Sequence, residues 1–178
     1  MEYTIHQHSH NFSAWAAARA ASVVGCRFTV ERGKGLLVSI GLTPDLDCPG
    51  KLPEPAQLDR THRRWRQRMI AKAAIEGWVV THGVAAKLIN VYLKSRFVCG
   101  GFADNPKVQA LHPPIDRLLL EELAREDFGG KRKFWAQVNQ CGWSKFDSTT
   151  YENVIQEIRN SLNAGPMWEI ERFWKGHQ

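Results

Sequence analysis

Hydrophobic and polar residues alternate with the period of helices over most of the chain. The pattern predicts helices over residues 12–22, 59–75, 84–98, 115–125, 149–162 and 166–174, and a short one around 133–143. Residues 27–40 have aliphatic stretches on both sides of a Gly-Lys-Gly turn, so either a small hairpin or a helix fits them. Because strands and helices do not alternate, we expect an all-α, compact multi-helix domain with at most one small β-hairpin.

Length and composition favour a single helical domain over residues 1–178. The chain is 43% apolar, which is enough for a proper core. It has neither an apolar run of about 20 residues nor the start of a secretion signal, so we expect a cytoplasmic protein without a membrane segment. The sequence has no glycine-rich nucleotide-binding loop, so we expect no cofactor. The four cysteines form no CxxC pair, which argues against a zinc ribbon, and we expect reduced, partly buried thiols.

The segment from Arg60 to Lys72 is the strongest charge feature of the chain. It holds six basic residues and no acidic one, which equals the whole net charge of +6. In a helix, Arg60, Arg64, Arg68 and Lys72 lie four apart and form one stripe. Like charges at this spacing destabilise a helix by about 0.2–0.5 kcal/mol per pair, so the three pairs cost about 1 kcal/mol. An anion beside the stripe would remove that cost.

Two kinds of surroundings fit this basic stripe. The stripe can be solvated or can meet acidic residues of the same chain, for example Glu121, Glu122, Glu126 and Asp127. Alternatively, the anion is nucleic-acid phosphate. Arginine outnumbers lysine five to one in the segment, and the guanidinium group binds phosphate with two parallel hydrogen bonds.

The helix expected over residues 84–98 has Lys87, Asn90 and Lys94 on its polar side and follows a glycine. With the run GVAAK, from Gly83 to Lys87, the chain resembles the helix-hairpin-helix DNA glycosylase superfamily. That family has a hairpin of the form G-V-G-x-K, whose backbone amides face a DNA phosphate and whose lysine can be the catalytic nucleophile. Ala85 stands where the family has its second glycine.

The resemblance continues at residues 114–119, PIDRLL, which look like the family's catalytic aspartate at the start of the next helix. Asp116 occupies the position of that aspartate. It follows Lys87 by 29 residues, so the resemblance implies an inserted loop at about residues 102–111. In total the resemblance covers roughly residues 70–125.

The resemblance implies a base-excision DNA glycosylase that acts on a damaged or modified base and can also have lyase activity. Asp116 would stabilise positive charge on the sugar, and Lys87 would form a Schiff base. The target base would leave the duplex and enter a pocket with aromatic walls. The basic stripe, Gly83 with its neighbouring amides, and Lys94 would bind DNA phosphates.

Each of these residues also has a purely structural interpretation. Lys87 lies on the polar side of its helix, as a solvated surface lysine would. Asp116 lies where helix N-termini favour an acid. A protein of another class therefore stays open: a non-catalytic helical adaptor that binds nucleic acid or an acidic protein through residues 60–72.

Histidines alternate near the N-terminus, at His6, His8 and His10. In an extended strand, all three imidazoles would lie on one side and could bind a metal ion. Because terminal segments are often disordered, the alternation can equally be incidental, and we assign no metal site.

Overall fold

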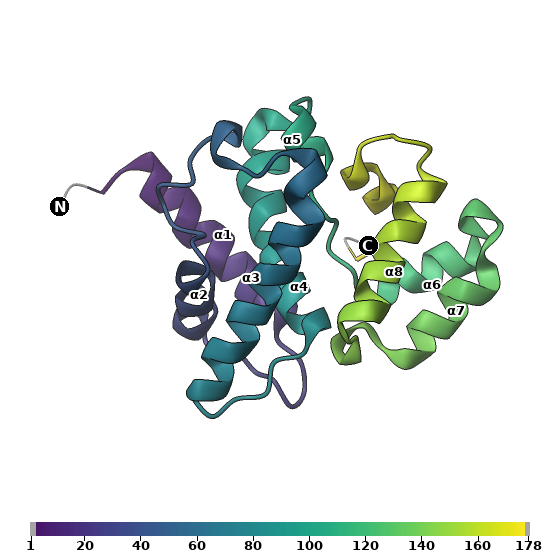
Figure 1. The fold of residues 1–178 in the computed structure, drawn as a ribbon, viewed down its shortest axis with the longest axis horizontal. Coiled ribbons are helices and arrows are strands. Elements are labelled where there is room, and N and C mark those ends of the chain that lie inside the picture. The colour runs from purple at the N-terminus through teal and green to yellow at the C-terminus, as the bar shows by residue number, and fades with distance from the viewer. Residues whose placement is uncertain (1–2, 177–178) are drawn as a thin grey trace.

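The computed structural model describes residues 3–176, and within this range it is built from helices and loops (Figure 1). The α-helices are α1 (Ile5–Ala21), α2 (Val30–Ser39), α3 (Pro55–Ile75), α4 (His82–Leu93), α5 (Pro106–Gln109), α6 (Arg117–Arg125), α7 (Arg132–Cys141) and α8 (Ser148–Ser161). A π-helical turn, η2 (Lys94–Phe102), continues α4, and the 3-10 segments are η1 (Pro49–Lys51), η3 (Phe128–Gly130), η4 (Trp143–Lys145) and η5 (Met167–Phe173). The all-α prediction is confirmed. None of the described helices is both long and apolar enough to cross a bilayer.

The segment 27–40, which the sequence allowed to be either a small hairpin or a helix, contains helix α2. Thr29 caps this helix by accepting a hydrogen bond from the Arg32 amide. Gly33 lets α2 approach α1 closely, because a Cβ at this position would lie 2.7 Å from the Cβ of Ala18. The glycine that suggested a turn in the sequence is therefore a helix-packing position.

The N-terminal histidines lie in α1, which begins at Ile5 rather than near Phe12. In a helix the three alternating imidazoles cannot share one side. His10 is buried and its Nδ1 lies 2.8 Å from the Tyr92 hydroxyl. Burial, and then the charges of Lys34 and Arg96, lower the pKa of His10 to about 4. This segment is therefore not the extended strand in which the three histidines could have bound a metal ion together.

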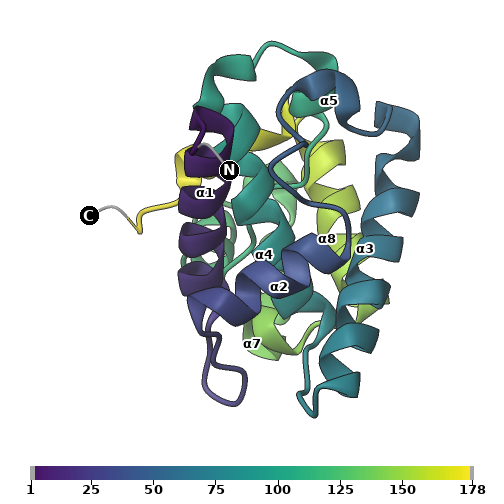
Figure 2. The ribbon, with the colours of Figure 1, turned by 90° about the vertical axis from the view of Figure 1, so that its left-hand side faces the viewer.

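The hydrophobic core consists of two clusters, and helix α4 contacts both. One cluster fills the space among α1–α5, which we call the N-terminal lobe. The other lies among α6–α8 and η5, the C-terminal lobe, and includes Ala86 of α4. The two lobes lie side by side in Figure 1, and Figure 2 shows α4 between α1 and α3. Helix α4 is therefore covered by α1 and α3 on its flanks and by η4 and α8 of the other lobe.

An extended, buried segment leads from the N-terminal lobe to the first residue of the C-terminal lobe. Asn90 of α4 holds it by donating a hydrogen bond to the Pro113 carbonyl (2.9 Å). His112 lies 3.0 Å from the Tyr151 hydroxyl on one side and 2.8 Å from Asp59 on the other. These contacts fix residues 112–115 against α3, α4 and α8 and so determine where Asp116 caps the start of α6.

A partly buried ion pair also joins the two lobes. Arg66 of α3 is 1% exposed and donates to Oε1 of Glu152 in α8 (2.7 Å), while its guanidinium group lies 4.5 Å from the centre of the Tyr151 ring. Arg63, which is exposed, donates to the other carboxylate oxygen at 2.5 Å. The basic segment is thus divided, since two of its arginines bind a carboxylate of the same chain.

We expect Glu152→Ala to lower the free energy of unfolding by about 3–5 kcal/mol, because it leaves the Arg66 charge buried without a counterion. Arg63→Ala removes the exposed member of the same cluster and is the matched control, with an expected loss of at most about 1 kcal/mol. Urea unfolding followed by circular dichroism measures both. Equal losses in the two variants would show that Arg66 does not depend on Glu152.

Candidate active site

Lys87 lies in the interior of the protein, although it is on the polar side of its helix. Ten of the twelve residues of α4 are buried, and Lys87 is 6% exposed. The polar side of α4 faces the C-terminal lobe rather than water, which is why the interpretation of Lys87 as a solvated surface lysine is wrong. A buried ammonium group is costly unless it has a partner.

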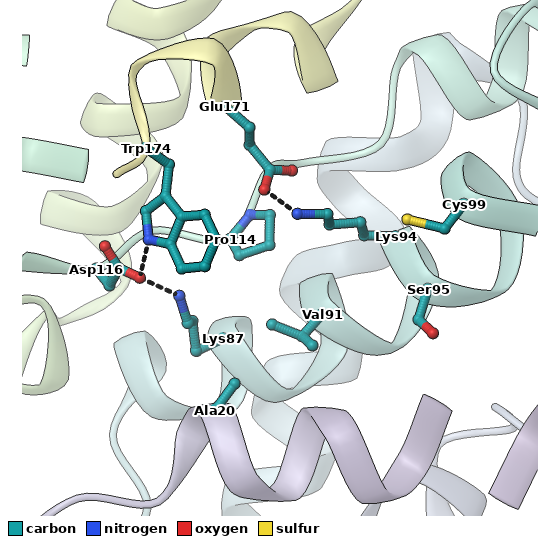
Figure 3. Close-up of a pocket in the computed structure, with 10 residues that line it drawn as sticks. All are labelled: Ala20, Lys87, Val91, Lys94, Ser95, Cys99, Pro114, Asp116, Glu171 and Trp174. Atoms are coloured by element: carbon teal, nitrogen blue, oxygen red, sulfur yellow. Dashed lines mark hydrogen bonds and ion pairs between the residues drawn. The ribbon is translucent and has the colours of Figure 1, made fainter. Parts of the chain in front are cut away.

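The partner is Asp116. Its Oδ2 lies 2.9 Å from Nζ of Lys87 and also accepts a hydrogen bond from the Trp174 indole (3.0 Å), as Figure 3 shows. Its Oδ1 accepts from the Leu119 amide (2.9 Å) and so caps α6. The two interpretations of this residue therefore hold together: Asp116 is the acid at a helix N-terminus and also the counterion of Lys87.

The pair faces a cavity of about 300 Å³ between the two lobes (Figure 3). Its lining comes from α1, α4, η2, η5 and the segment before α6, and consists of Ala20, Lys87, Val91, Lys94, Ser95, Cys99, Pro114, Asp116, Glu171 and Trp174. Ala20, Val91, Pro114 and Trp174 are the apolar residues among them. The volume is at the lower end of the range for small-molecule sites, roughly 300–1,000 Å³.

A second ion pair lines the same cavity. Lys94, at the start of η2, contacts the carboxylate of Glu171 in η5, and its Nζ lies 5.7 Å from the centre of a Trp174 ring. In Figure 3 the Trp174 ring lies between the Asp116 carboxylate and Lys94, and Ser95 and Cys99 lie beyond Lys94. Lys94 therefore has a carboxylate partner inside the protein, which does not fit the phosphate-binding role predicted for it.

The surroundings shift the pKa values of these groups in different directions. Burial lowers the pKa of Lys87, and the nearby Asp116 carboxylate only partly opposes this. Burial alone would raise the pKa of Asp116, but the Lys87 charge, the Leu119 amide and the Trp174 indole together hold it below its ordinary value. Burial raises the pKa of Glu171 in spite of Lys94. The cavity thus combines an easily deprotonated amine with one carboxylate that stays ionised and one that retains its proton more strongly.

The predicted phosphate-binding amides around Gly83 are occupied within the protein. The Gly83 amide donates to the Phe146 carbonyl (3.1 Å), and those of Val84 and Ala85 donate to the side chain and carbonyl of the helix cap Thr81. A Cβ at position 83 would lie 1.8 Å from the Trp143 carbonyl oxygen. Glycine is needed here because η4 packs against the start of α4, and the prediction that Gly83 contacts phosphate is wrong.

The basic stripe does not line the cavity, because α3 contributes none of the lining residues and lies on the other flank of α4 from α1 (Figure 2). Arg60, Arg64 and Arg68 are exposed. Within residues 3–176 none of the three has a carboxylate partner; Arg64 contacts the Thr61 hydroxyl, and Arg68 donates to the Ser39 carbonyl. Lys72 pairs with Glu76 (2.9 Å).

The acids suggested as partners of the stripe pair with other residues. Glu121 pairs with Arg117, and both Glu122 and Glu126 pair with Arg125. Asp127 accepts a hydrogen bond from the Arg132 amide. Intramolecular neutralisation by these four acids is therefore excluded, and the outer arginines of α3 are solvated.

Sequence reasoning missed two residues of the cavity, Glu171 and Trp174. Both lie in or directly after η5, which packs against α6 and closes the cavity from the C-terminal end of the chain. The predicted helix over residues 166–174 located this segment, but no spacing within it indicated a contact with Lys87 or Asp116. Cys99, one of the four free cysteines, also lines the cavity; Cys48, Cys99 and Cys141 are exposed rather than partly buried.

Comparison with known proteins gives no relative for this arrangement: no protein-family model matches the chain, and neither a curated protein nor a solved structure is detectably similar to it. Within residues 3–176, no group of three or more histidine, cysteine, aspartate or glutamate side chains is placed to hold a metal ion.

We expect Asp116→Asn to destabilise the protein by about 3 kcal/mol near neutral pH, because asparagine can still cap α6 but leaves the Lys87 ammonium without a counterion. The double variant Lys87→Met/Asp116→Asn should recover much of that loss. The folded protein releases the Lys87 proton at a lower pH than the unfolded chain, so the loss in Asp116→Asn should shrink as the pH rises. Urea unfolding between pH 7 and 10 measures these free energies for Asp116→Asn, Lys87→Met and the double variant. If the losses of the two single variants add up in the double variant, the two side chains do not depend on each other.

Proposed function

We propose that the protein is a DNA-binding enzyme that excises a damaged or modified base, with Lys87 and Asp116 as its catalytic residues. The observation that carries the proposal is the contact between Nζ of Lys87 and Oδ2 of Asp116, 2.9 Å apart, at the wall of a cavity between the lobes. A buried lysine paired with a carboxylate also occurs as a structural ion pair. What favours chemistry is that both side chains face an open cavity lined by other ionisable groups.

The chemistry needs both members of the pair in stated forms. When the bond between base and sugar breaks, positive charge develops on the sugar, and an ionised Asp116 would stabilise it. A neutral Lys87 amine can then attack the sugar carbon and lead to a Schiff base. The pKa directions fit these roles, since the surroundings lower both the pKa of Lys87 and that of Asp116.

The walls of the cavity suit a flat, uncharged ligand. Val91, Pro114 and the ring of Trp174 provide apolar surface beside the pair (Figure 3). Its volume of about 300 Å³ suits a single base better than a larger ligand. A base rotated out of a duplex or taken from a single strand would be the species that enters.

We expect borohydride to trap a covalent adduct between the protein and DNA that carries an abasic site, or one uracil, hypoxanthine or 8-oxoguanine. Lys87→Met should abolish the adduct, because the Schiff base forms on that amine. Denaturing electrophoresis detects the product. Lys145→Met, which removes an exposed lysine, is the matched control and should leave the adduct intact. An adduct that persists in Lys87→Met would rule out the assigned nucleophile.

A second candidate function is supported by a different observation: Arg60, Arg64 and Arg68 are exposed and have no carboxylate partner within the described part of the chain. We propose, as the alternative, a helical adaptor that binds nucleic acid or an acidic protein through the outer face of α3. Because this face is separate from the cavity, adaptor binding does not require the Lys87–Asp116 pair.

If the outer face of α3 binds DNA phosphate, the triple variant Arg60→Ala/Arg64→Ala/Arg68→Ala should reduce the slope of log affinity against log salt by roughly 0.9 for each lost phosphate contact. Fluorescence anisotropy with a labelled duplex at several salt concentrations measures the slope. The triple variant Arg117→Ala/Arg125→Ala/Arg132→Ala removes the same net charge from exposed positions of the C-terminal lobe. Equal effects of the two variants would mean that only net charge matters.

A further inference from the structure

The cavity contains a second carboxylate, Glu171, that the chemistry above does not use. Its side chain is 15% exposed and contacts Lys94, on the other side of the Trp174 ring from Asp116 (Figure 3). A glutamate held inside a ligand-sized cavity, beside a lysine and facing a nucleophile, is placed to exchange a proton with whatever enters.

The two carboxylates of the cavity have different environments. Burial raises the pKa of Glu171, and the charge of Asp116 adds to that effect, while Lys94 and Lys87 oppose it. Asp116 is held ionised by Lys87, the Leu119 amide and the Trp174 indole. Two carboxyl groups whose pKa values are shifted in opposite directions commonly divide the work: the one with the lower pKa stabilises positive charge and the one with the higher pKa donates a proton.

We propose that Glu171 is the general acid that protonates the departing base, with Lys94 as the residue that positions it. This inference rests on the proposed function and adds a third catalytic residue to Lys87 and Asp116. It also defines the substrate class, because only a base that is neutral in DNA needs a proton to leave. A base that already carries a positive charge, such as an N7-alkylated purine, departs as a neutral molecule without one.

The proposed step breaks one bond and forms one, and each proton released has an acceptor. The bond between the sugar carbon and the base nitrogen breaks, and its electron pair stays with the base, which takes the proton of Glu171. The neutral Lys87 amine supplies the electron pair of the new carbon–nitrogen bond, and one of its protons passes to Asp116. Glu171 is then a carboxylate beside the Lys94 ammonium, which is the contact that the structure contains.

Lys94 therefore has a defined role in the step. A cation beside the acid stabilises the carboxylate that forms when the proton leaves, so the proton transfer becomes less unfavourable. Sequence reasoning assigned Lys94 to DNA phosphate, but its contact with Glu171 assigns it to the cavity. The remaining cavity residues with titratable or polar groups, Ser95, Cys99 and Trp174, carry no charge that would replace Lys94.

The test compares Glu171→Gln with wild-type protein on three substrates: a duplex with a neutral lesion (uracil, hypoxanthine or 8-oxoguanine), a duplex with 7-methylguanine, and a preformed abasic site. We expect Glu171→Gln to release the neutral base about 10²–10⁴-fold more slowly, as is typical for loss of a general acid. Release of 7-methylguanine and borohydride trapping at the abasic site should stay within a few fold of wild type, because neither needs a proton for the leaving group. Glu169→Gln, in the same segment η5, is the matched control.

The pH dependence of base release is a second test, and it uses the variant Lys94→Met. Release of the neutral base should decline on the alkaline side as Glu171 loses its proton, and this decline should be absent in Glu171→Gln. Lys94→Met removes the cation that lowers the pKa of Glu171, so the decline should move to higher pH. This shift decides the question even if Glu171→Gln does not fold.

The outcomes separate the two proposals. If Glu171→Gln releases the neutral base at the wild-type rate, or if the pH profile is unchanged in Lys94→Met, the role of Glu171 is overturned while base excision stands. If the wild-type protein releases 7-methylguanine but no neutral base, the role of Glu171 is also overturned while base excision stands. If it forms an adduct at the abasic site but releases no base, base excision fails as well. If wild-type protein neither releases a base nor forms an adduct on any substrate, the proposed function itself fails.

Discussion

Helix α4 is covered on almost every side, and it carries a lysine in its buried part. An ammonium group in the interior costs several kcal/mol of free energy unless a charge or several hydrogen bonds compensate for it. The protein meets this requirement with Asp116, whose position in turn depends on the buried segment 112–115 and its hydrogen bond from Asn90. The way the lobes join is therefore tied to one pair of charges, and the cavity beside that pair follows from the same junction.

The ion pair of Arg66 with Glu152 also joins the lobes, and there the buried charge is compensated in a different way. Arg66 is as deeply buried as Lys87, but its charge is surrounded by Glu152, Ser148, His82 and the ring of Tyr151. A guanidinium group with this many partners is held in one position and ties the two lobes together. Lys87 has a single carboxylate partner and faces a cavity, and burial lowers the pKa of its amine. The difference in partners separates a cation enclosed by the structure from one that borders a cavity.

Much of the fold could be predicted from the sequence because its signals are local. Caps such as Asp116 and the helical spacing of apolar residues located α3, α4, α6 and α8 to within a few residues. The Gly-Lys-Gly run of α2 misled because glycine serves close helix packing as well as turns, and only the neighbouring Ala18 decides between them. Local patterns state which side of a helix is polar, but they do not state what covers that side.

That distinction explains what the sequence could and could not predict of the site. Lys87 and Asp116 were selected through a local resemblance, and their contact depends on residues 112–115 that no periodic pattern describes. The burial of Lys87 depends on the C-terminal lobe, whose residues are distant in the chain. Glu171 and Trp174 come from a short 3-10 segment and the residue after it, where helical periodicity carries little information. Their place in the cavity is a property of the tertiary structure alone.

The charges of the cavity also limit what can bind there. Two lysines are matched by two carboxylates, so the interior offers no excess positive charge to hold a phosphate group. A flat, uncharged ligand such as a base loses less solvation on entering than a phosphate would, and it can use the apolar faces of Val91, Pro114 and Trp174. If the ligand is a base of DNA, as proposed, the phosphates would have to lie outside the cavity. The solvated arginines of α3 lie on the other flank of α4, so DNA bound to both would have to extend around that side of the N-terminal lobe.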